Sequence, residues 1–259
     1  MKLKNKVAVI TGGAAGIGRA VALRYASEGA HCAIVDIAPD QARTVAAEIE
    51  AAGGRAFGLG ADVTQQAEID GMVAAVAGEA QRIDILFNSA GVVDIQPVME
   101  VTRDSWDHVM DTNLKGAFFV LQAVAGQMIE QGEGGKIINV ASEAGRRGGP
   151  RATQYCASKA GVISMTQSAA LGLIAHGINV NAIAPGLIET AMWNKIDRIL
   201  TEQGIMEAGE IKRRGKKETP YGRTGVPDDL VGTAVFLASQ DSDYIVGQTI
   251  NVDGGRVLS

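Results

Sequence analysis

Thr11-Gly12-Gly13-Ala14-Ala15-Gly16-Ile17-Gly18 decides the fold of this chain, because it joins an apolar run at residues 6–11 to an amphipathic segment that ends near Gly29. A glycine-rich turn between a strand and a helix is typical of phosphate binding, since glycines let the backbone approach a pyrophosphate closely. The helix that follows offers free N–H groups and the positive end of its dipole to the negative charge. With the run at 32–36, the stretch predicts a strand-helix-strand unit that binds a dinucleotide. An ordinary glycine turn is the alternative interpretation.

The same alternation continues along the chain and predicts the fold class. Short apolar runs alternate with helix-period segments at 56–59, 83–87, 136–140, 178–184 and 248–252. We therefore expect an α/β fold, a Rossmann-type doubly wound parallel sheet of seven strands with helices on both faces. No Pro/Ser-rich linker divides the chain, so residues 1–259 are expected to form a single domain that binds the dinucleotide. Residues 187–219 interrupt the alternation with mixed charges and no strand pattern, which predicts a lid insertion.

Composition narrows the class of partner. A formal net charge of −5 disfavours nucleic acid and anionic membranes, because neither polyanion is attracted to an acidic surface. No apolar run approaches the roughly 18 residues of a membrane span. Cys32 and Cys156 are interpreted as buried thiols and not as a disulfide framework. The sequence thus predicts a cytoplasmic protein with a small-molecule partner, and no metal site is expected.

Asp36 ends the second predicted strand, where a carboxylate meets the ribose of a bound dinucleotide. A carboxylate accepts hydrogen bonds from both ribose hydroxyls, whereas a 2′-phosphate there would face a like charge. NAD is therefore favoured over NADP. Arg19, on the helix after the turn, is kept as a residue that would soften this preference if it faced the cofactor, although a surface position is commoner for such a residue.

Two later strand ends are expected to complete the rim of the cofactor site. Asp62 and Val63 follow the third strand, and the carboxylate of Asp62 is placed to take an adenine amino group. Asn88, Ala90 and Gly91 follow the fourth strand, where small residues permit close approach. Plain turn chemistry is the alternative, because Asp, Asn and Gly are common in such loops.

These motifs, taken together and in order, resemble the short-chain dehydrogenase/reductase family from residue 6 to the C-terminus. The resemblance rests on the following residues: Thr11-Gly-x-x-x-Gly-Ile-Gly18, Asp62, Asn88-x-Ala-Gly91, Asn113, Ser142, Tyr155-x-x-x-Lys159, Pro185-Gly186 and Thr190. Ser89 departs from the family pattern, which usually repeats asparagine there, and this bears on a local turn hydrogen bond only. The cofactor-binding residues expected from the motifs and the resemblance are Gly12, Gly16, Ile17, Gly18, Asp36, Asp62, Val63, Asn88, Ala90, Gly91, Tyr155, Lys159, Pro185, Gly186, Ile188 and Thr190.

The expected catalytic residues are Asn113, Ser142, Tyr155 and Lys159. Oxidation of an alcohol needs a base for the hydroxyl proton, and a phenol with a reference pKa of about 10 is too weak unless it is assisted. Lys159, at i+4 from Tyr155 on one helix face, is expected to favour the phenolate and to lower that pKa. The resemblance further implies that Lys159 bonds the nicotinamide ribose, Ser142 holds the substrate oxygen and Asn113 helps carry the proton to water. Taken singly, each residue has a structural explanation, such as an exposed helix pair or a cap.

The substrate is expected from a closer resemblance, to the bacterial sorbitol (polyol) dehydrogenases. It rests on five segments: Lys136-Ile-Ile-Asn139, Ala141-Ser-x-Ala-Gly-Arg-Arg-Gly148, Val162-Ile-Ser-x-Thr-Gln-Ser168, His176-Gly-Ile-Asn-Val-Asn-Ala-Ile-Ala-Pro-Gly186 and residues 243–255. It implies oxidation of D-sorbitol to D-fructose with NAD⁺, an activity of the L-iditol 2-dehydrogenase type. Residues 191–197 also resemble meso-2,3-butanediol dehydrogenases, so a butanediol/acetoin or other secondary-alcohol activity stays open. So do an NADPH-dependent ketone reductase and, outside enzymes, a nucleotide-sensing scaffold.

A polyol needs several polar partners, and Glu143, Arg146, Gln154 and Asn194 lie in segments expected to border the pocket. The expected substrate contacts are Ser142, Glu143, Gln154, Tyr155 and Trp193.

Small side chains recur on the helix that bears Tyr155, at Ala157, Ala160, Ser164 and Ser168. They permit close packing of another helix, and the family resemblance implies a homotetramer. Packing within the chain explains the same spacing equally well.

Overall fold

A computed structural model describes residues 1–259, whose seven strands form one parallel sheet in the order β3-β2-β1-β4-β5-β6-β7. The strands are β1 (Val7–Thr11), β2 (His31–Asp36), β3 (Arg55–Gly60), β4 (Ile85–Asn88), β5 (Gly135–Val140), β6 (Ile178–Pro185) and β7 (Thr249–Val252). All five residues of β1 and all eight of β6 are buried. Strands covered on both faces favour a continuous apolar run, which β1 shows from Val7 to Ile10. In β6 the buried amides of Asn179 and Asn181 interrupt the run, and both donate to the carbonyl of Ile245. The expected seven-stranded α/β fold is confirmed.

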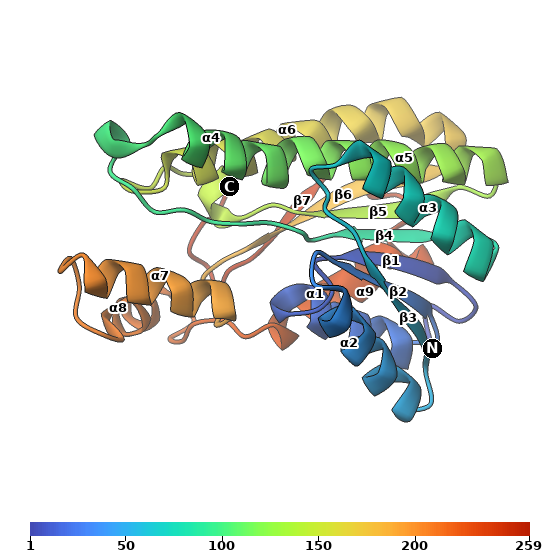
Figure 1. Ribbon diagram of the computed structural model, residues 1–259, viewed down its shortest axis with the longest axis horizontal. Helices are drawn as coiled ribbons and strands as arrows, with labels where there is room; N and C mark the ends of the chain where they lie inside the picture. The colour runs from blue at the N-terminus through green and yellow to red at the C-terminus, as the bar shows by residue number, and fades with distance from the viewer.

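The α-helices connect these strands and supply the outer layers. They are α1 (Gly16–Ser27), α2 (Pro39–Ala51), α3 (Gln66–Ala80), α4 (Arg103–Met110), α5 (Ala117–Gln131), α6 (Thr153–Leu173), α7 (Ala191–Glu202), α8 (Glu210–Glu218) and α9 (Asp228–Ala238). A π-helical turn, Asp111–Gly116, joins α4 to α5. Figure 1 shows α3, α4, α5 and α6 on one face of the sheet, and α1, α2 and α9 on the other. None of the helices combines the length and the apolar character needed to cross a bilayer.

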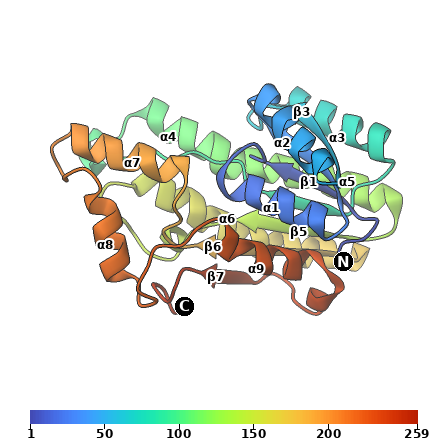
Figure 2. The same cartoon turned by 90° about the horizontal axis from the view of Figure 1, so that it is seen from below.

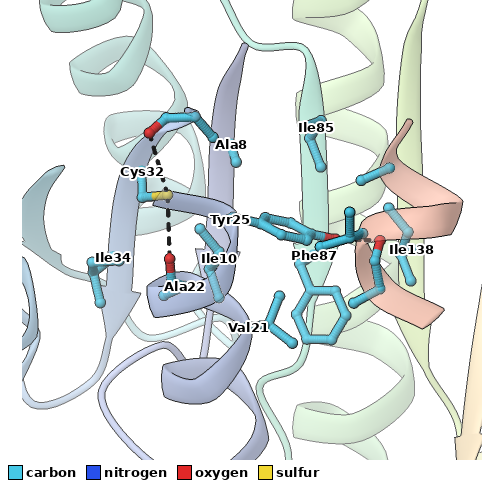
Figure 3. Close-up of a cluster of buried hydrophobic side chains, with 14 of the residues drawn as sticks. Ala8, Ile10, Val21, Ala22, Tyr25, Cys32, Ile34, Ile85, Phe87 and Ile138 are labelled. Carbon is cyan, nitrogen blue, oxygen red and sulfur yellow. Dashed lines mark hydrogen bonds between the residues drawn. The ribbon is translucent and has the colours of Figure 1, made fainter. Parts of the chain in front are cut away.

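Each face of the sheet has its own apolar core. Figure 3 shows the core beneath α1 and α9, in which Tyr25 packs edge-on against Phe87 with ring centroids 6.1 Å apart. The Tyr25 hydroxyl donates to the carbonyl of Ala234 on α9 at 3.0 Å, so the buried phenol keeps a partner. Cys32 is fully buried in this core, as expected, whereas Cys156 is only partly buried.

The strand order reverses between β1 and β4, because β2 and β3 lie on one side of β1 and the later strands on the other. In an open parallel sheet the loops leave a crevice at this point, beyond the carboxyl ends of the strands. The loop after β6 leads into α7 and α8, which Figures 1 and 2 show standing apart from the sheet. We call residues 187–219 the α7–α8 insertion. It packs through Leu200 and Ile196 against Val93, Ile95 and Tyr155.

Candidate active site

A cavity of about 630 Å³ runs along the carboxyl ends of the strands and beneath the α7–α8 insertion. We call it the active-site cavity. Of the residues expected to bind a cofactor, its wall contains Gly12, Gly16, Ile17, Gly18, Asp36, Gly91, Tyr155, Lys159, Pro185, Gly186, Ile188 and Thr190. The remaining four, Asp62, Val63, Asn88 and Ala90, do not line it.

The turn between β1 and α1 accepts only glycine at two of its positions. Gly12 has φ +63°, and a Cβ there would lie 3.0 Å from the backbone of Ala90. A Cβ on Gly18 would lie 2.2 Å from the carbonyl oxygen of Gly12. The bare backbone therefore faces the cavity at the first turn of α1, where unpaired N–H groups and the helix dipole favour a phosphate. The geometry fits a dinucleotide pyrophosphate.

Asp36 lies at the cavity wall beside this turn. Its two carboxylate oxygens accept hydrogen bonds from the backbone N–H groups of Ala14 and Ala38, each at 3.1 Å. These bonds hold the carboxylate at the end of β2. Arg19 is turned away from Asp36, because its guanidinium contacts Glu48 at 2.6 Å. Arg19 therefore does not form an ion pair with Asp36.

Thr11 is a structural support of the cofactor turn that the sequence reasoning did not single out. Its buried hydroxyl donates to Asn88 Oδ1 at 3.2 Å and accepts from the N–H groups of Ser89 and Ala90 at 3.0 and 3.2 Å. Asn88 in turn donates to Asn139 Oδ1 at 3.1 Å. Asn88 thus joins three neighbouring strands from behind the cavity. In the sequence, the position of Thr11 directly before the glycines is the feature that points to this supporting role.

Asp62 and Val63 have a local structural role in this chain. Asp62 Oδ1 accepts hydrogen bonds from the N–H and the hydroxyl of Thr64, at 2.9 and 2.8 Å, as in an Asx turn. Val63 is buried against the π-helical turn, where a Cβ on Gly116 would lie 2.7 Å from its carbonyl oxygen. The turn chemistry considered as the alternative accounts for these contacts.

Tyr155 and Lys159 share one face of α6 and both line the cavity. The Lys159 ammonium lies 5.9 Å from the centroid of the Tyr155 ring and donates to the carbonyl of Val140 at 2.7 Å. Burial lowers the pKa of Lys159 to about 8.

The pKa of Tyr155 differs in direction from the expectation. Burial raises it, the hydrogen bond with the Ser142 hydroxyl lowers it, and the nearby Cys156 and Glu143 raise it again. Lys159 does not offset these effects, because a lysine with a pKa of about 8 has lost its charge at the pH where an unassisted phenol ionises. The Ser142 hydroxyl is the neighbouring group that lowers the pKa of Tyr155.

Ser142 and Asn113 approach the same region from two different elements. Ser142 follows β5, and its hydroxyl caps a short 3₁₀ turn by accepting from Ala144 N–H at 3.1 Å. Asn113 lies in the π-helical turn, a feature frequent at functional sites. Its side chain accepts from Val92 N–H at 2.7 Å and donates to Ser158 Oγ at 3.1 Å. Asn113 thus fixes the segment after β4 against α6.

The far end of the cavity is mostly apolar, with a charged edge. Its apolar residues are Val93, Ile95, Leu187, Met192, Trp193 and Ile196. The charged edge consists of Glu143 and Arg147, whose guanidinium lies 3.1 Å from the Glu143 carboxylate.

Three polar residues expected at the pocket lie elsewhere. Gln154 has no exposed surface, and its amide donates to Ser105 Oγ at 3.1 Å behind the cavity. Arg146 donates to Asn251 and to the carbonyl of Thr249. Asn194 does not line the cavity.

No group of three His, Cys, Asp or Glu side chains is placed to hold a metal ion.

Comparison with known proteins fits this arrangement. A family model described as enoyl-(acyl carrier protein) reductase, one of the short-chain dehydrogenase/reductase models, matches residues 12–256. The chain belongs to the short-chain dehydrogenase/reductase family. It is 50% identical to a sorbitol dehydrogenase of Cereibacter sphaeroides and 51% identical to a galactitol 2-dehydrogenase of Agrobacterium fabrum, with full coverage of both chains in each case. The crystal structure of a short-chain type dehydrogenase/reductase from Mycobacterium marinum matches with a TM-score of 0.90 at 35% identity, over 100% of this chain and 98% of the other.

Membership in this family makes the protein an oxidoreductase that uses a nicotinamide cofactor. The four catalytic positions expected from the sequence lie just after the end of β5, in the π-helical turn and on α6.

Proposed function

We propose that this short-chain dehydrogenase/reductase is an NAD-dependent polyol dehydrogenase that interconverts a sugar alcohol and a ketose, with D-sorbitol to D-fructose as the first candidate reaction. The observation that carries the proposal is one cavity that holds Tyr155 and Ser142 beside the charged pair Glu143–Arg147. The similarity to a sorbitol and a galactitol dehydrogenase, both acting on polyols by name, supports it.

Tyr155 is the acid/base of the proposed reaction. Its phenol takes the proton of the reacting hydroxyl, while Ser142 hydrogen-bonds to the phenol and holds the substrate oxygen next to it. Lys159, anchored on Val140, supplies positive charge beside the phenol below pH 8. Asn113 positions the segment after β4 and thus the wall of the nicotinamide site.

The cofactor is proposed to lie along the glycine turn, with its ribose against Asp36. The Asp36 carboxylate is held by backbone N–H groups and not by an ion pair with Arg19, so it keeps its negative charge. It favours NAD, because a 2′-phosphate would lie against a like charge. When bound, the nicotinamide ring accepts the hydride that leaves the alcohol carbon. Asn88 and Ala90 act on the site through their hydrogen bonds with Thr11. Pro185 and Gly186 form part of the cavity wall.

Glu143 and Arg147 are proposed to bind the hydroxyls that do not react. A carboxylate accepts hydrogen bonds only, and a guanidinium donates only, so together they fix the orientation of a polyhydroxy chain. Trp193 of α7 closes the cavity over the substrate. The α7–α8 insertion is proposed to be a lid, because it contributes Thr190, Met192 and Ile196 to the same wall.

A second candidate, a butane-2,3-diol or similar secondary-alcohol dehydrogenase, is favoured by the apolar residues at the far end of the cavity. Val93, Ile95 and Met192 offer a polyol nothing but van der Waals contact. A short diol would need only the Ser142 and Tyr155 contacts.

One assay separates these functions. Purified protein is incubated with NAD⁺ or NADP⁺ and with sorbitol, galactitol, mannitol, xylitol or butane-2,3-diol, and the absorbance of reduced cofactor is followed. The polyol proposal expects the highest kcat/KM with a hexitol and NAD⁺. The highest kcat/KM with butane-2,3-diol would select the second candidate. A protein that binds NADH but oxidises none of these alcohols would be interpreted as a nucleotide-sensing scaffold.

A homotetramer is also proposed. Ala160, Ser164 and Ser168 are exposed and leave this part of α6 open to a neighbouring helix, whereas Ala157 is partly buried within the chain. Phe118 of α5 and Leu171 of α6 are exposed apolar side chains on the same layer. Light scattering coupled to size-exclusion chromatography measures the assembly directly.

A further inference from the structure

The C-terminal tail sends one side chain to the edge of the active-site cavity. Arg256 Nε lies 2.9 and 3.1 Å from the two carboxylate oxygens of Glu143, a residue 113 positions earlier in the chain. The side chains are 6% and 7% exposed, so the ion pair is buried. Glu143 directly follows Ser142 and lines the cavity, whereas Arg256 lies behind it.

The backbone around Arg256 is fixed on both sides. Asp253 accepts hydrogen bonds from Gly255 N–H at 2.9 Å and from Val257 N–H at 2.8 Å, so its carboxylate holds the residues that flank the arginine. Tyr221 N–H donates to the carbonyl of Gly254 at 3.0 Å, which attaches the tail to the chain just after α8. Arg256 therefore reaches Glu143 from an anchored position.

The Arg256 guanidinium has few other partners. Its Nη2 lies 3.4 Å from the carboxylate of Glu218, an exposed residue that ends α8, and its Nη1 is buried without a hydrogen-bond partner. Glu143 is thus the principal counterion of Arg256. The other titratable groups near Glu143 are the half-exposed Arg147 and the Tyr155 phenol.

We propose that Arg256 is a positioning residue for polyol specificity: it holds the Glu143 carboxylate in the cavity wall, in the orientation that accepts hydrogen bonds from substrate hydroxyls. The inference rests on the proposed polyol dehydrogenase function. Its physical reason is that a buried carboxylate without its counterion is costly and turns toward solvent or toward the half-exposed Arg147. A substrate with a single hydroxyl does not use Glu143 and serves as an internal reference.

The test compares kcat/KM for sorbitol or galactitol with kcat/KM for 2-butanol, both with NAD⁺, in Arg256→Met, Glu143→Gln and the double variant. We expect Arg256→Met to lower the polyol/2-butanol ratio by about tenfold, mainly through KM for the polyol, as expected for the loss of an oriented hydrogen bond to a charged group. In the Glu143→Gln background, Arg256→Met should change the ratio by less than about twofold, because the arginine then has no carboxylate to orient.

Equal losses on both substrates would overturn the inference, since they would indicate a general structural effect. So would an unchanged ratio, or the same tenfold change in the Glu143→Gln background. If Arg256→Met does not fold, Arg256→Lys gives the comparison: it keeps the charge and loses the planar geometry, and the ratio should still fall severalfold. A wild-type protein that binds NADH and oxidises no alcohol would instead overturn the proposed function itself.

Discussion

Lys159 Nζ donates a hydrogen bond to the backbone carbonyl of Val140 at 2.7 Å, and this bond ties α6 to the end of β5. Ser142 lies two residues beyond Val140, and Tyr155 lies one helical turn before Lys159. The contact therefore sets the spacing between the Ser142 hydroxyl, proposed to hold the substrate, and the Tyr155 phenol, proposed to take its proton. Positioning of this kind is a large part of what an active site supplies.

Tyr155→Phe should lower kcat for alcohol oxidation by about 10²–10⁴-fold, because only the proton-accepting oxygen is lost. The ring still packs against the apolar cluster of Val93, Ile95 and Leu200, so the dissociation constant of NADH should change little. Steady-state kinetics and NADH fluorescence titration measure the two effects separately. Substantial turnover in this variant would remove Tyr155 from its assigned role.

Most of the sheet and the cofactor turn could be predicted, because they depend on local patterns. β1 is an apolar run that leads directly into turn residues, and a Cβ on Gly18 would collide with the backbone of Gly12 in the same turn. The pairing of Glu143 with Arg256 could not be predicted, because it joins residues far apart in sequence and depends on how the tail is anchored.

Gln154 shows a second limit of sequence reasoning. It precedes Tyr155 directly, which suggested a place in the pocket, but successive side chains on an α-helix point about 100° apart. Tyr155 faces the cavity, and Gln154 therefore faces Ser105 in the interior. The pKa of Tyr155 was misjudged for a related reason, since burial of Lys159 and Tyr155 became visible only in the folded chain.

Two substitutions beside Tyr155 should move the pH profile of kcat/KM in opposite directions. Oxidation rises with pH as the phenol loses its proton. Ser142→Ala removes the hydrogen bond that lowers the pKa of Tyr155, so the rise should shift to higher pH. Glu143→Gln removes a negative charge that raises this pKa, so the rise should shift to lower pH. Shifts of the same sign in both variants would contradict this account of the tyrosine.

Lys159 should make the stability of the protein increase between pH 7 and pH 10. Burial lowers its folded-state pKa to about 8, below the unfolded value of about 10.4, so the unfolded chain binds more protons in this range. The folded state consequently gains stability as pH rises, by about 2 kcal/mol relative to Lys159→Met. Urea unfolding of both proteins at the two pH values measures this gain in stability. The other titrating groups contribute equally in both proteins, so their effects cancel when the two are compared. Parallel pH dependence in the two proteins would argue against a depressed lysine pKa.

Asp36→Asn should raise the ratio of kcat/KM with NADP⁺ to kcat/KM with NAD⁺ by about tenfold, because the like charge that faces a 2′-phosphate is removed. The amide oxygen of asparagine still accepts one of the backbone bonds from Ala14 and Ala38, so the turn should keep its shape. Arg19→Gln is the matched control: its guanidinium pairs with Glu48, and the ratio should not change. An unaltered ratio in Asp36→Asn would show that the ribose lies elsewhere.

Thr11→Val should destabilise the folded protein and weaken cofactor binding together. The valine keeps the shape of the side chain but leaves the N–H groups of Ser89 and Ala90 without their shared acceptor, and Asn88 Oδ1 without its donor. Buried groups left unpaired in this way cost on the order of 3 kcal/mol together. Thr11→Ser keeps the hydroxyl and loses one methyl, so its cost should be about 1 kcal/mol.

Urea unfolding ranks the variants by stability, and NADH titration at low denaturant reports whether the loop after β4 still contacts Gly12. If serine proves as costly as valine, the methyl and not the hydroxyl supports this turn, and the hydrogen bonds that join β1 to β4 would contribute little to the site.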